Sequence, residues 1–455
     1  MTTHVPTLVV GAGISGLVCA YALRKAGVDA HIVESSTRPG GVIRSERREG
    51  YLLEFGPQSF NATSAVRNLC CELRIEDQLL QASPGAPRYV LANGELRAVP
   101  LSPQAFIASS LFSMGTKLKI LRDLFGRSAP PEADESIGAF IRRKFSPELL
   151  EKLVGPFVSG IYAGDPESLS LRSSFPQLYE AEKSAGSVIR GLLRGGKRGN
   201  PGDKPSLQAF RDGNQTLIDA LAANLESNLR CDVTAQSIRF APLTANQAAF
   251  EIVVRAIGQE EILTADRLII ATPAQQAAVL LRDLDPQFEY TLQQIEYAPL
   301  AVVSLGYAKG AIRHSLKGFG FLVPRSSGLR ILGTVWNSSL FPTRAPEGHV
   351  LLTSFVGGAT YLRAVSLTES QLVSTVHREL APILGISQEP CFSSAWKYHR
   401  AIPQYNIGHA EQIGRSNELQ AKYPNIWLAG NYLRGPALGA CIELALTIAR
   451  QAGKK

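Results

Sequence analysis

The sequence has few cysteines, and none of them follows the spacing of a metal site. The six are Cys19, Cys70, Cys71, Cys231, Cys391 and Cys441. No two form a C-x-x-C pair, and their spacing suits neither zinc nor haem attachment. We therefore predict no metal site, and we interpret the cysteines as reduced thiols in a reducing compartment.

Long apolar segments are also missing. No stretch of about 18 apolar residues occurs, so no membrane-spanning helix is predicted. The N-terminus lacks the pattern of a signal peptide, because its apolar run of Leu8 to Val10 is followed at once by glycine. These features predict a cytoplasmic protein and leave peripheral attachment to the inner face of the membrane open.

Several catalytic and binding motifs are absent. The sequence contains neither G-x-S-x-G nor H-E-x-x-H, and its seven histidines are scattered, so nucleophilic catalysis has no support. No array of basic and aromatic residues suits nucleic acid, and we expect no nucleic-acid partner. The net charge of +8 still favours an anionic partner, such as an anionic lipid surface or an acidic small molecule.

The length of the chain exceeds what one core supports. A single hydrophobic core stops growing at about 250–300 residues, whereas this chain has 455 residues, of which 45% are hydrophobic. That composition is globular rather than disordered. We therefore expect two or three folded units.

The N-terminal residues carry the first positive signal. Residues 7–10 (TLVV) are predicted to form a buried strand, which is followed by GAGISG and then by a helical pattern up to about Gly27. A second predicted strand over residues 29–33 ends at Glu34. A G-x-G-x-x-G between strand and helix, with an acidic residue after the next strand, is typical of dinucleotide binding. The motif consists of Gly11, Ala12, Gly13, Ile14, Ser15 and Gly16. In it Gly11 permits the tight turn, Gly13 lets the backbone approach a pyrophosphate, and Gly16 lets the helix pack close to the strand. Glu34 is predicted to accept the ribose hydroxyl hydrogens.

The residues after Glu34 favour FAD over NAD. Residues 35–45 (SSTRPGGVIRS) resemble the R-x-G-G-x-x-x-S extension of FAD-binding oxidases of the amine oxidase superfamily. In that interpretation Gly40 and Gly41 bring backbone close to the diphosphate, and Arg44 adds a positive charge there.

Two distant segments point to the same cofactor. Near the C-terminus, a predicted strand over residues 425–431 leads through the glycine turn GPALG into a predicted helix over residues 440–452, which offers a second helix N-terminus. Residues 269–273 (IIATP) resemble the buried strand and turn that this superfamily places against the first nucleotide-binding strand. We therefore predict a discontinuous, Rossmann-like FAD domain.

The middle of the chain is predicted to contain a helical unit and a mixed sheet. Residues 103–126 show amphipathic helical spacing with a basic polar face, typical of membrane-surface docking or of a helix packed on its own domain. Ser136 and Ser146 are predicted helix N-caps. The glycine-rich residues 191–205 imitate a phosphate-binding loop, but Arg198 replaces the required Ser or Thr, and we predict a loop without nucleotide. The predicted strands cover residues 300–307, 319–323, 331–335 and 350–355.

Nearly the whole chain resembles the protoporphyrinogen oxidases, the oxygen-dependent FAD enzymes of haem biosynthesis. The resemblance includes residues 11–17 (GAGISGL), 331–346 (ILGTVWNSSLFPTRAP) and 428–439 (LAGNYLRGPALG). Residues 155–178 (GPFVSGIYAGDPESLSLRSSFPQL) are the most specific, because general FAD oxidases lack this block. The implied α/β + α fold has an FAD-binding domain (1–85, 206–290, 405–455), a mixed α/β substrate-binding domain (86–97, 291–404) and a helical, membrane-binding domain (98–205).

The resemblance also implies the site residues. The implied FAD contacts are Gly11 to Gly16, Glu34, Ser35, Gly40, Gly41, Val42, Arg44, Gly56, Pro57, Gln58, Ser59, Ala429, Gly430, Pro436, Ala437 and Leu438. The implied substrate contacts are Arg88, Gly160, Leu322, Leu332 and Phe341, and the catalytic candidates are Gln58 and Phe341. Arg88 matches an arginine that pairs with a propionate, since a guanidinium suits a carboxylate bidentately. No general base is evident, and the adenine contact is left open between Val233 and Ser237.

The implied reaction oxidises protoporphyrinogen IX to protoporphyrin IX in three two-electron steps, with O₂ reduced to H₂O₂. One alternative is oxidation of coproporphyrinogen III, whose four propionates need more cations; Arg97 and Arg344 are available but unplaced by sequence. A flavin amine oxidase would need an aromatic cage, and none is evident. A flavin-binding scaffold without activity is a further alternative. Family members are often dimers, which makes a homodimer a partner to consider.

Overall fold

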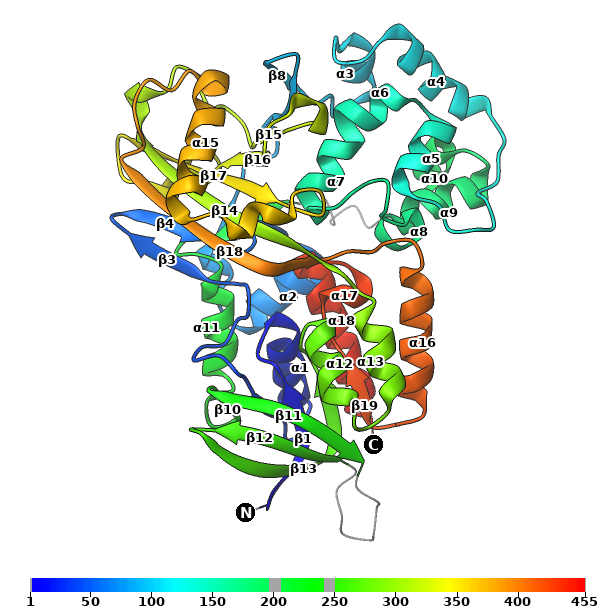
Figure 1. Cartoon of the computed structure of the whole chain (residues 1–455), viewed down its shortest axis with the longest axis vertical. Helices are drawn as coiled ribbons and strands as arrows, with labels where there is room; N and C mark the ends of the chain where they lie inside the picture. The colour runs from blue at the N-terminus through cyan, green and yellow to red at the C-terminus, as the bar shows by residue number, and fades with distance from the viewer. Residues whose placement is uncertain (1, 196–205, 241–249, 455) are drawn as a thin grey trace.

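The structure, a computed structural model, describes residues 2–195, 206–240 and 250–454. Two large sheets organise these residues, one in each half of the molecule, and a helical unit lies beside the second sheet (Figure 1). The part of the glycine-rich stretch over residues 196–205 lies outside the described residues.

The first sheet is the one predicted to bind a dinucleotide. Its order is β10-β2-β1-β13-β12-β11, with β19 beside β13. The strands are β1 (Thr2–Val10), β2 (His31–Val33), β10 (Leu229–Arg230), β11 (Val233–Phe240), β12 (Phe250–Ala256), β13 (Gln259–Ile270) and β19 (Ile426–Leu428). β1 lies parallel to both β2 and β13, and Val9 is paired with Ile269. The predicted placement of residues 269–270 against the first strand is therefore confirmed.

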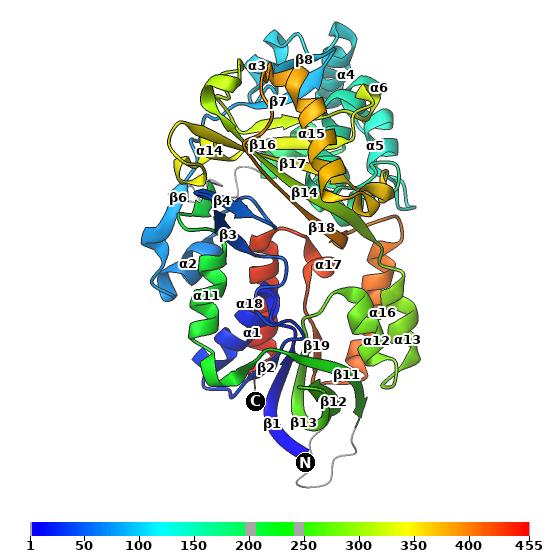
Figure 2. The same ribbon diagram turned by 60° about the vertical axis from the view of Figure 1, so that its left-hand side comes forward.

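Helices cover both faces of this sheet, as parallel strands require. Figure 2 shows α1, α11 and α18 on one face and α12, α13 and α16 on the other. The first group is α1 (Ile14–Lys25), α11 (Gln215–Ala223) and α18 (Leu438–Ala452), and the second is α12 (Ala274–Leu281), α13 (Pro286–Gln293) and α16 (His409–Ala421). Leu17, Leu221 and Ile442 share one buried cluster with Val9 of the sheet. Strands from the two ends and the middle of the chain thus form one unit.

The second sheet has the order β18-β14-β17-β16-β15-β7-β8. Its strands are β7 (Arg88–Ala92), β8 (Glu95–Ala98), β14 (Tyr297–Ala308), β15 (Gly320–Leu322), β16 (Ile331–Trp336), β17 (His349–Gly357) and β18 (Phe392–Pro403). The four predicted strands are present, whereas the long strand β18 was not predicted. α15 (Glu369–Leu384) packs on one face, where Val303, Leu305 and Leu380 share a buried cluster. Because side chains alternate along a strand, Leu300 and Ser304 point to the opposite face, toward the first unit.

The helical unit contains α3 (Pro103–Ala108), α4 (Met114–Phe125), α5 (Ile137–Lys144), α6 (Pro147–Leu149), a π-helical turn (Leu150–Val154), α7 (Gly155–Tyr162), α8 (Leu171–Ser174), α9 (Pro176–Ala185) and α10 (Val188–Gly195). The predicted caps are correct: the Ser136 and Ser146 hydroxyls accept from the backbone of Ala139 and Leu149. Within the described residues, no helix is long and apolar enough to cross a membrane.

Two predictions for this unit were wrong. The helical pattern over residues 103–126 is interrupted, because Leu111 and Phe112 turn into the core and Ser113 caps a new helix, α4. Residues 191–195 belong to α10 and not to a loop. A Cβ on Gly191 would lie 2.4 Å from the Ala181 Cα, so this glycine serves close packing of α10 on α9.

Short elements complete the fold. They are β3 (Ser45–Arg48), β4 (Tyr51–Glu54), β5 (Phe60–Asn61), β6 (Leu79–Gln81), β9 (Leu207–Phe210), α2 (Ser64–Glu72), α14 (Asn337–Leu340) and α17 (Asn431–Arg434), and the 3-10 turns at Glu76–Gln78, Glu226–Asn228, Lys309–Ala311, Arg325–Ser327, Pro342–Arg344 and Leu362–Ser366. β3 and β4 form a ribbon whose side chains reach the second sheet: the Tyr51 ring stacks on Phe392 at 4.6 Å.

Candidate functional site

The turn from β1 to α1 is shaped by three glycines. Gly11 has φ of +103°, and a Cβ on Gly16 would lie 1.9 Å from the Gly11 carbonyl oxygen. A side chain at either position would therefore distort the turn. A Cβ on Gly13, by contrast, would meet nothing within 4 Å. The fold itself requires Gly11 and Gly16, whereas Gly13 leaves its backbone open to a ligand.

Two helix N-termini meet at this turn. α1 begins after Gly13 and α18 after Ala437, and neither N-cap has a side-chain hydrogen bond or an acidic residue in its first turn. The Cys441 side chain of α18 lies close to Ser15 of α1, so the two ends are adjacent. Unpaired N–H groups at helix N-termini attract phosphate. This geometry fits the pyrophosphate of a dinucleotide.

Glu34 lies at the end of β2 and is only 9% exposed. Its carboxylate accepts hydrogen bonds from the Ala12 N–H at 2.7 Å and from the Ser36 N–H at 2.9 Å, and Ser35 lies within 3.4 Å. The Val233 N–H donates to the Glu34 carbonyl at 2.9 Å. Of the two residues left open by the sequence, Val233 therefore lies beside Glu34, whereas Ser237 lies farther along β11, beyond a register shift.

Arg38 holds the glycine segment in place. Its guanidinium donates to the carbonyls of Pro39, Gly41 and Ile43 at 2.8–3.1 Å. The Gly40 N–H donates to the Ala12 carbonyl at 2.7 Å, which ties this segment to the first turn. The segment around Gly40 and Gly41 is therefore built to lie next to Gly13, with which Gly40 forms an isolated bridge.

Arg44 and Val42 face β18. The Arg44 guanidinium pairs with Glu46 and lies over the rings of Phe55 and Trp396, at 5.1 and 4.9 Å from their centroids. Val42 is exposed, and its carbonyl accepts from the Tyr398 hydroxyl at 3.5 Å. The sequence had predicted Arg44 to face the diphosphate but had not assigned Trp396 a role.

The residues after β4 form the next part of the site. A Cβ on Gly56 would lie 2.2 Å from the Val42 carbonyl oxygen, and the Pro57 carbonyl accepts from Asn214. Ser59 follows Gln58, which is 7% exposed. At the far end of the chain, buried Ala429 donates its N–H to the Ile270 carbonyl, and Gly430 is the N-cap of α17. Pro436, Ala437 and Leu438 lead into α18.

The predicted substrate residues come from neighbouring strands of the second sheet. Arg88 of β7 pairs with Gly320 of β15, and Leu322 of β15 pairs with Gly333 of β16, beside Leu332. A Cβ on Gly160 of α7 would lie 2.5 Å from a methyl group of Leu322. The missing side chain at Gly160 therefore lets α7 touch the predicted pocket.

Phe341 and Arg88 are linked by aromatic residues that the sequence did not identify. Phe341 is 2% exposed and shares a cluster with Phe319 and Phe355, and Phe355 also packs with Leu332. The Arg88 guanidinium lies 5.5 Å from the Phe319 ring centroid. Phe355 could have been found from strand alternation, because it points to the same face as Leu300.

The cations near these residues differ in their partners. Arg344 is fully buried and forms an ion pair with Glu54 at 3.1 Å, and exposed Arg97 pairs with Glu95 at 2.6 Å. Among the described residues, Arg88 has no carboxylate partner. Arg88 is thus the cation of this group that is available to an acidic ligand.

One buried polar atom near the cofactor turn has no partner. The Thr272 side chain lies next to Gly11, and its hydroxyl is buried and has no hydrogen-bond partner within the described residues. Together with the open space at Gly13 and the uncapped helix ends, this atom fits a polar cofactor at the turn. Elsewhere, a cavity of about 610 Å³ opens beside β14, but its lining (Gln275, Tyr297, Arg400 and neighbours) includes none of the predicted site residues.

Comparison with known proteins supports this interpretation. The family described as flavin containing amine oxidoreductase matches residues 14–452. A chloroplastic protoporphyrinogen oxidase of Oryza sativa subsp. japonica is 36% identical over 471 residues, covering 98% of this chain and 87% of the relative. A coproporphyrinogen III oxidase of Bacillus subtilis (strain 168) is 30% identical over 457 residues, covering 96% and 95%.

Solved structures share the fold. A crystal structure from Exiguobacterium sp. 255-15, named as a candidate protoporphyrinogen oxidase, has a TM-score of 0.80 and 25% identity, covering 99% of this chain and 98% of the other. Cyclohexylamine oxidase from Brevibacterium oxydans IH-35A has a TM-score of 0.67 and 16% identity, covering 99% and 100%. The predicted resemblance and the predicted cofactor are confirmed: the chain belongs to the flavin containing amine oxidoreductase family, and its cofactor is FAD.

Proposed function

We propose that the protein is an oxidase of porphyrin biosynthesis that converts protoporphyrinogen IX to protoporphyrin IX with O₂. The observation that carries this proposal is the placement of Arg88, Leu322 and Leu332 on adjacent strands, with Phe341 behind them. A cation without a carboxylate partner, beside an apolar surface, suits an apolar macrocycle that bears few carboxylates. The names of the relatives from Oryza sativa and Bacillus subtilis support the same substrate class.

The side chains of this site bind and orient rather than exchange protons. Arg88 would hold a propionate through its planar guanidinium, and the apolar side chains would hold the ring and exclude water. Bound FAD supplies the two-electron acceptor. The Gln58 amide is engaged at both ends, by Asn337 and by the carbonyls of Glu54 and Gly56. We therefore assign Gln58 a positioning role and no proton transfer.

The partners of the arginines favour protoporphyrinogen over coproporphyrinogen. Four propionates need several cations, but Arg344 is neutralised by Glu54 and Arg97 by Glu95. An amine substrate is less well supported, because the face of the Trp396 ring is already covered by Arg44. The position of Val233 next to Glu34 supports it as the adenine contact rather than Ser237.

The test offers each porphyrinogen separately to the purified yellow protein in air, with porphyrin fluorescence and peroxide as readouts. We expect faster oxidation of protoporphyrinogen IX, and we expect Arg88→Ala to raise its KM at least tenfold. Arg97→Ala is the matched control and is expected to leave KM unchanged. Faster oxidation of coproporphyrinogen III would move the substrate to the alternative, and oxidation of neither would contradict the proposal.

The glycine turn offers a separate test of the FAD contacts. Gly13→Ala adds a methyl group where the structure leaves open space, so the variant is expected to fold but to lose bound FAD. Gly414→Ala is the control, because its Cβ also meets nothing within 4 Å and it lies in α16, away from the turn. Retention of FAD by Gly13→Ala, judged by absorbance after gel filtration, would contradict the predicted phosphate contact.

We also propose that the helical unit docks on an anionic membrane from the cytoplasmic side. Its exposed apolar side chains gather on α3, α4 and α10: Ile107, Met114, Leu118, Leu121, Phe125, Leu192 and Leu193. Phe125 is the most exposed of these side chains, at 80%. Lys117, Lys119 and Arg122 lie on the same helix, α4, and would face anionic headgroups. Apolar side chains flanked by basic ones are typical of membrane-surface contact.

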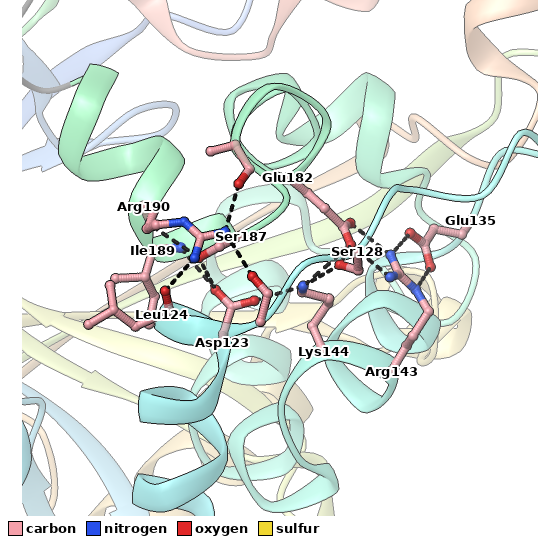
Figure 3. Close-up of polar contacts among 12 residues, drawn as sticks. Asp123, Leu124, Ser128, Glu135, Arg143, Lys144, Glu182, Ser187, Ile189 and Arg190 are labelled. Carbon is pink, nitrogen blue, oxygen red and sulfur yellow. Dashed lines mark hydrogen bonds and ion pairs between the residues drawn. The ribbon is translucent and has the colours of Figure 1, made fainter.

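Polar contacts hold α4 so that these side chains point outward. Glu148 accepts from the Ser113 N–H and from the hydroxyls of Ser113 and Thr116 at the start of α4. Near its end, Asp123 accepts from the Ser187 hydroxyl and the Ile189 N–H, which anchors α10 (Figure 3). Since α4 is held at both ends, its apolar face is presented to the outside without a change in the fold.

A further inference from the structure

A buried ion pair joins the two halves of the molecule. Glu54 at the end of β4 is 2% exposed, and Arg344, in the turn that follows Phe341, is fully buried. The Arg344 Nη2 lies 3.1 Å from the Glu54 Oε1. The same carboxylate accepts from the Asn214 N–H at 2.9 Å and from the Ser45 hydroxyl at 2.6 Å. Glu54 is therefore fixed by groups of the nucleotide-binding unit, and Arg344 is fixed by Glu54 and by the Phe210 carbonyl, to which its Nη2 donates at 3.3 Å.

Stability alone is a poor reason for such a pair. Two charges lose their hydration on burial, and well-packed apolar residues of similar volume often stabilise a protein as much or more. The Arg344 Nη1 even lacks a hydrogen-bond partner within the described residues. What the pair provides is a fixed geometry between two segments that are far apart in the sequence.

Arg344 lies against Phe341. Its guanidinium lies 5.6 Å from the Phe341 ring centroid, and its backbone N–H donates to the Phe341 carbonyl at 3.1 Å. Phe341 is one of the residues proposed to contact the tetrapyrrole. The Phe341 ring therefore packs with Phe319 and Phe355 and also lies near the guanidinium of Arg344, which its ion pair holds in place.

A second contact joins the same two segments. Asn337, at the start of α14, donates its amide to the Gln58 Oε1 at 2.7 Å across 279 residues of sequence. Gln58 in turn donates to the Glu54 carbonyl at 2.9 Å. Asn337 is 3% exposed, and its own Oδ1 has no partner in the described part of the chain. Asn337 therefore sets the orientation of Gln58 as Arg344 sets that of Phe341.

We infer that Arg344, Glu54 and Asn337 are positioning residues that hold Phe341 and Gln58 in register at the tetrapyrrole site. The inference rests on the proposed function and deepens it. Arg344 is thereby excluded as a propionate ligand, because its guanidinium faces Glu54 and not the strand surface that carries Arg88. The two contacts act on opposite ends of the Asn337–Arg344 segment, so loss of either one should loosen the site.

The test compares neutral variants in the full-length holoenzyme. Glu54→Gln/Arg344→Met removes both charges while Gln keeps an acceptor for Asn214 and Ser45, and Asn337→Ala removes the second contact without touching a charge. The controls are Arg230→Met, which breaks the exposed pair with Glu261 on the first sheet, and Asn406→Ala, which breaks an exposed contact with Glu296. Protoporphyrin IX and coproporphyrin III are the probes, and their binding is read from fluorescence without turnover.

Both site variants are expected to keep a melting temperature close to that of the wild type and to bind protoporphyrin IX at least fivefold more weakly, with a matching rise in KM. If the contacts were purely structural, the variants would melt at a lower temperature but would bind protoporphyrin IX with wild-type affinity while folded. That result would overturn the inference and leave the proposed function intact. If the double variant does not fold, Asn337→Ala decides alone. A wild-type protein that binds neither porphyrin would overturn the proposed function together with the inference.

Discussion

The molecule contains two buried charge clusters that behave in opposite ways. At the junction of the two sheets, Glu54 has a single cation, Arg344, and burial raises the pKa of Glu54 to about 7 despite that charge. In the helical unit, Glu182 is also fully buried, but Arg143 donates to both its oxygens at 2.8 and 2.9 Å and Lys144 lies 3.4 Å away (Figure 3). Burial again acts to raise the pKa of Glu182, but these donors and Ser128 lower it to about 2.

The two clusters differ in how fully their buried charges are compensated. Bidentate, charge-assisted hydrogen bonds compensate Glu182 for lost hydration, so its ionised form stabilises the helical unit. Asp123 follows the same rule: burial opposes ionisation, but Lys144, Ile189 and Ser187 hold its pKa below the ordinary value. The junction pair is less fully compensated, since Arg344 reaches Glu54 with one nitrogen only. We conclude that the helical cluster serves stability and that the junction pair serves geometry.

The largest effect is expected from breaking the junction pair on one side. Arg344→Met leaves the Glu54 carboxylate buried without a counter-charge, which typically destabilises a protein by about 3–5 kcal/mol. Because Glu54 can take up a proton, the loss should be smaller at pH 5.5 than at pH 8. Denaturant unfolding followed by tryptophan fluorescence at the two pH values measures it. Equal losses at both would mean that Glu54 is already neutral in the wild type.

A smaller effect is expected in the helical cluster. Glu182→Gln keeps the size of the side chain but removes its charge, and Arg143 retains Glu135 as a partner. Because Arg143 is partly exposed, we expect a loss of only about 2 kcal/mol. The same unfolding experiment measures it, and porphyrin binding should not change. A loss of porphyrin affinity in this variant would remove the distinction between the two clusters.

Acid should act on the two clusters with opposite sign. The pKa of Glu182 is lowered in the folded state, so its contribution is present above the unfolded value near 4.5 and is lost as the pH falls toward 2. Glu148 behaves in the same way: burial opposes ionisation, but Lys152, Ser113 and Thr116 lower its pKa to about 2. The raised pKa of Glu54 has the opposite consequence. Its contribution to the free energy of unfolding is present below about pH 4.5 and is lost as the pH rises through about 7. Glu182→Gln should therefore flatten the acid limb of the stability profile by about 2 kcal/mol, and Glu54→Gln the limb between 4.5 and 7.

The smallest effect on stability is expected at the outer face of α4. Phe125→Glu replaces a side chain that is 80% exposed, so the free energy of unfolding should change by less than about 0.5 kcal/mol. Binding to vesicles that contain anionic lipid should nevertheless fall at least tenfold, because an apolar anchor becomes an anion. Co-sedimentation measures this, with Tyr290→Glu, an exposed aromatic position on α13, as the control. Unchanged sedimentation would contradict the proposed membrane contact.

Local chemistry made much of the nucleotide-binding unit predictable. The positive φ of Gly11 and the contact of Gly16 with Gly11 are required within one turn of the chain, so a short motif was enough to identify them. The strands of the second sheet were predicted for the same reason, because alternation and β-branched residues are local signals. β18 was missed because its strand carries polar residues at its exposed edge, such as Lys397 and His399, where the sheet needs no apolar side chain.

The cofactor turn and the family could be identified from the sequence alone, since the glycine motifs depend on residue types at fixed short spacings. The residues assigned to the tetrapyrrole came from the family resemblance and stay a prediction. The tertiary structure was needed to show which cations are paired with carboxylates, that the Arg344 guanidinium faces Glu54, and that Asn337 donates to Gln58. It also decided that Gly191 lies against Ala181 instead of in a loop. These contacts depend on how separate elements pack. Glu54 and Gln58 lie far from Arg344 and Asn337 in the sequence, and Ala181 belongs to another helix than Gly191, so no local periodicity encodes the pairing.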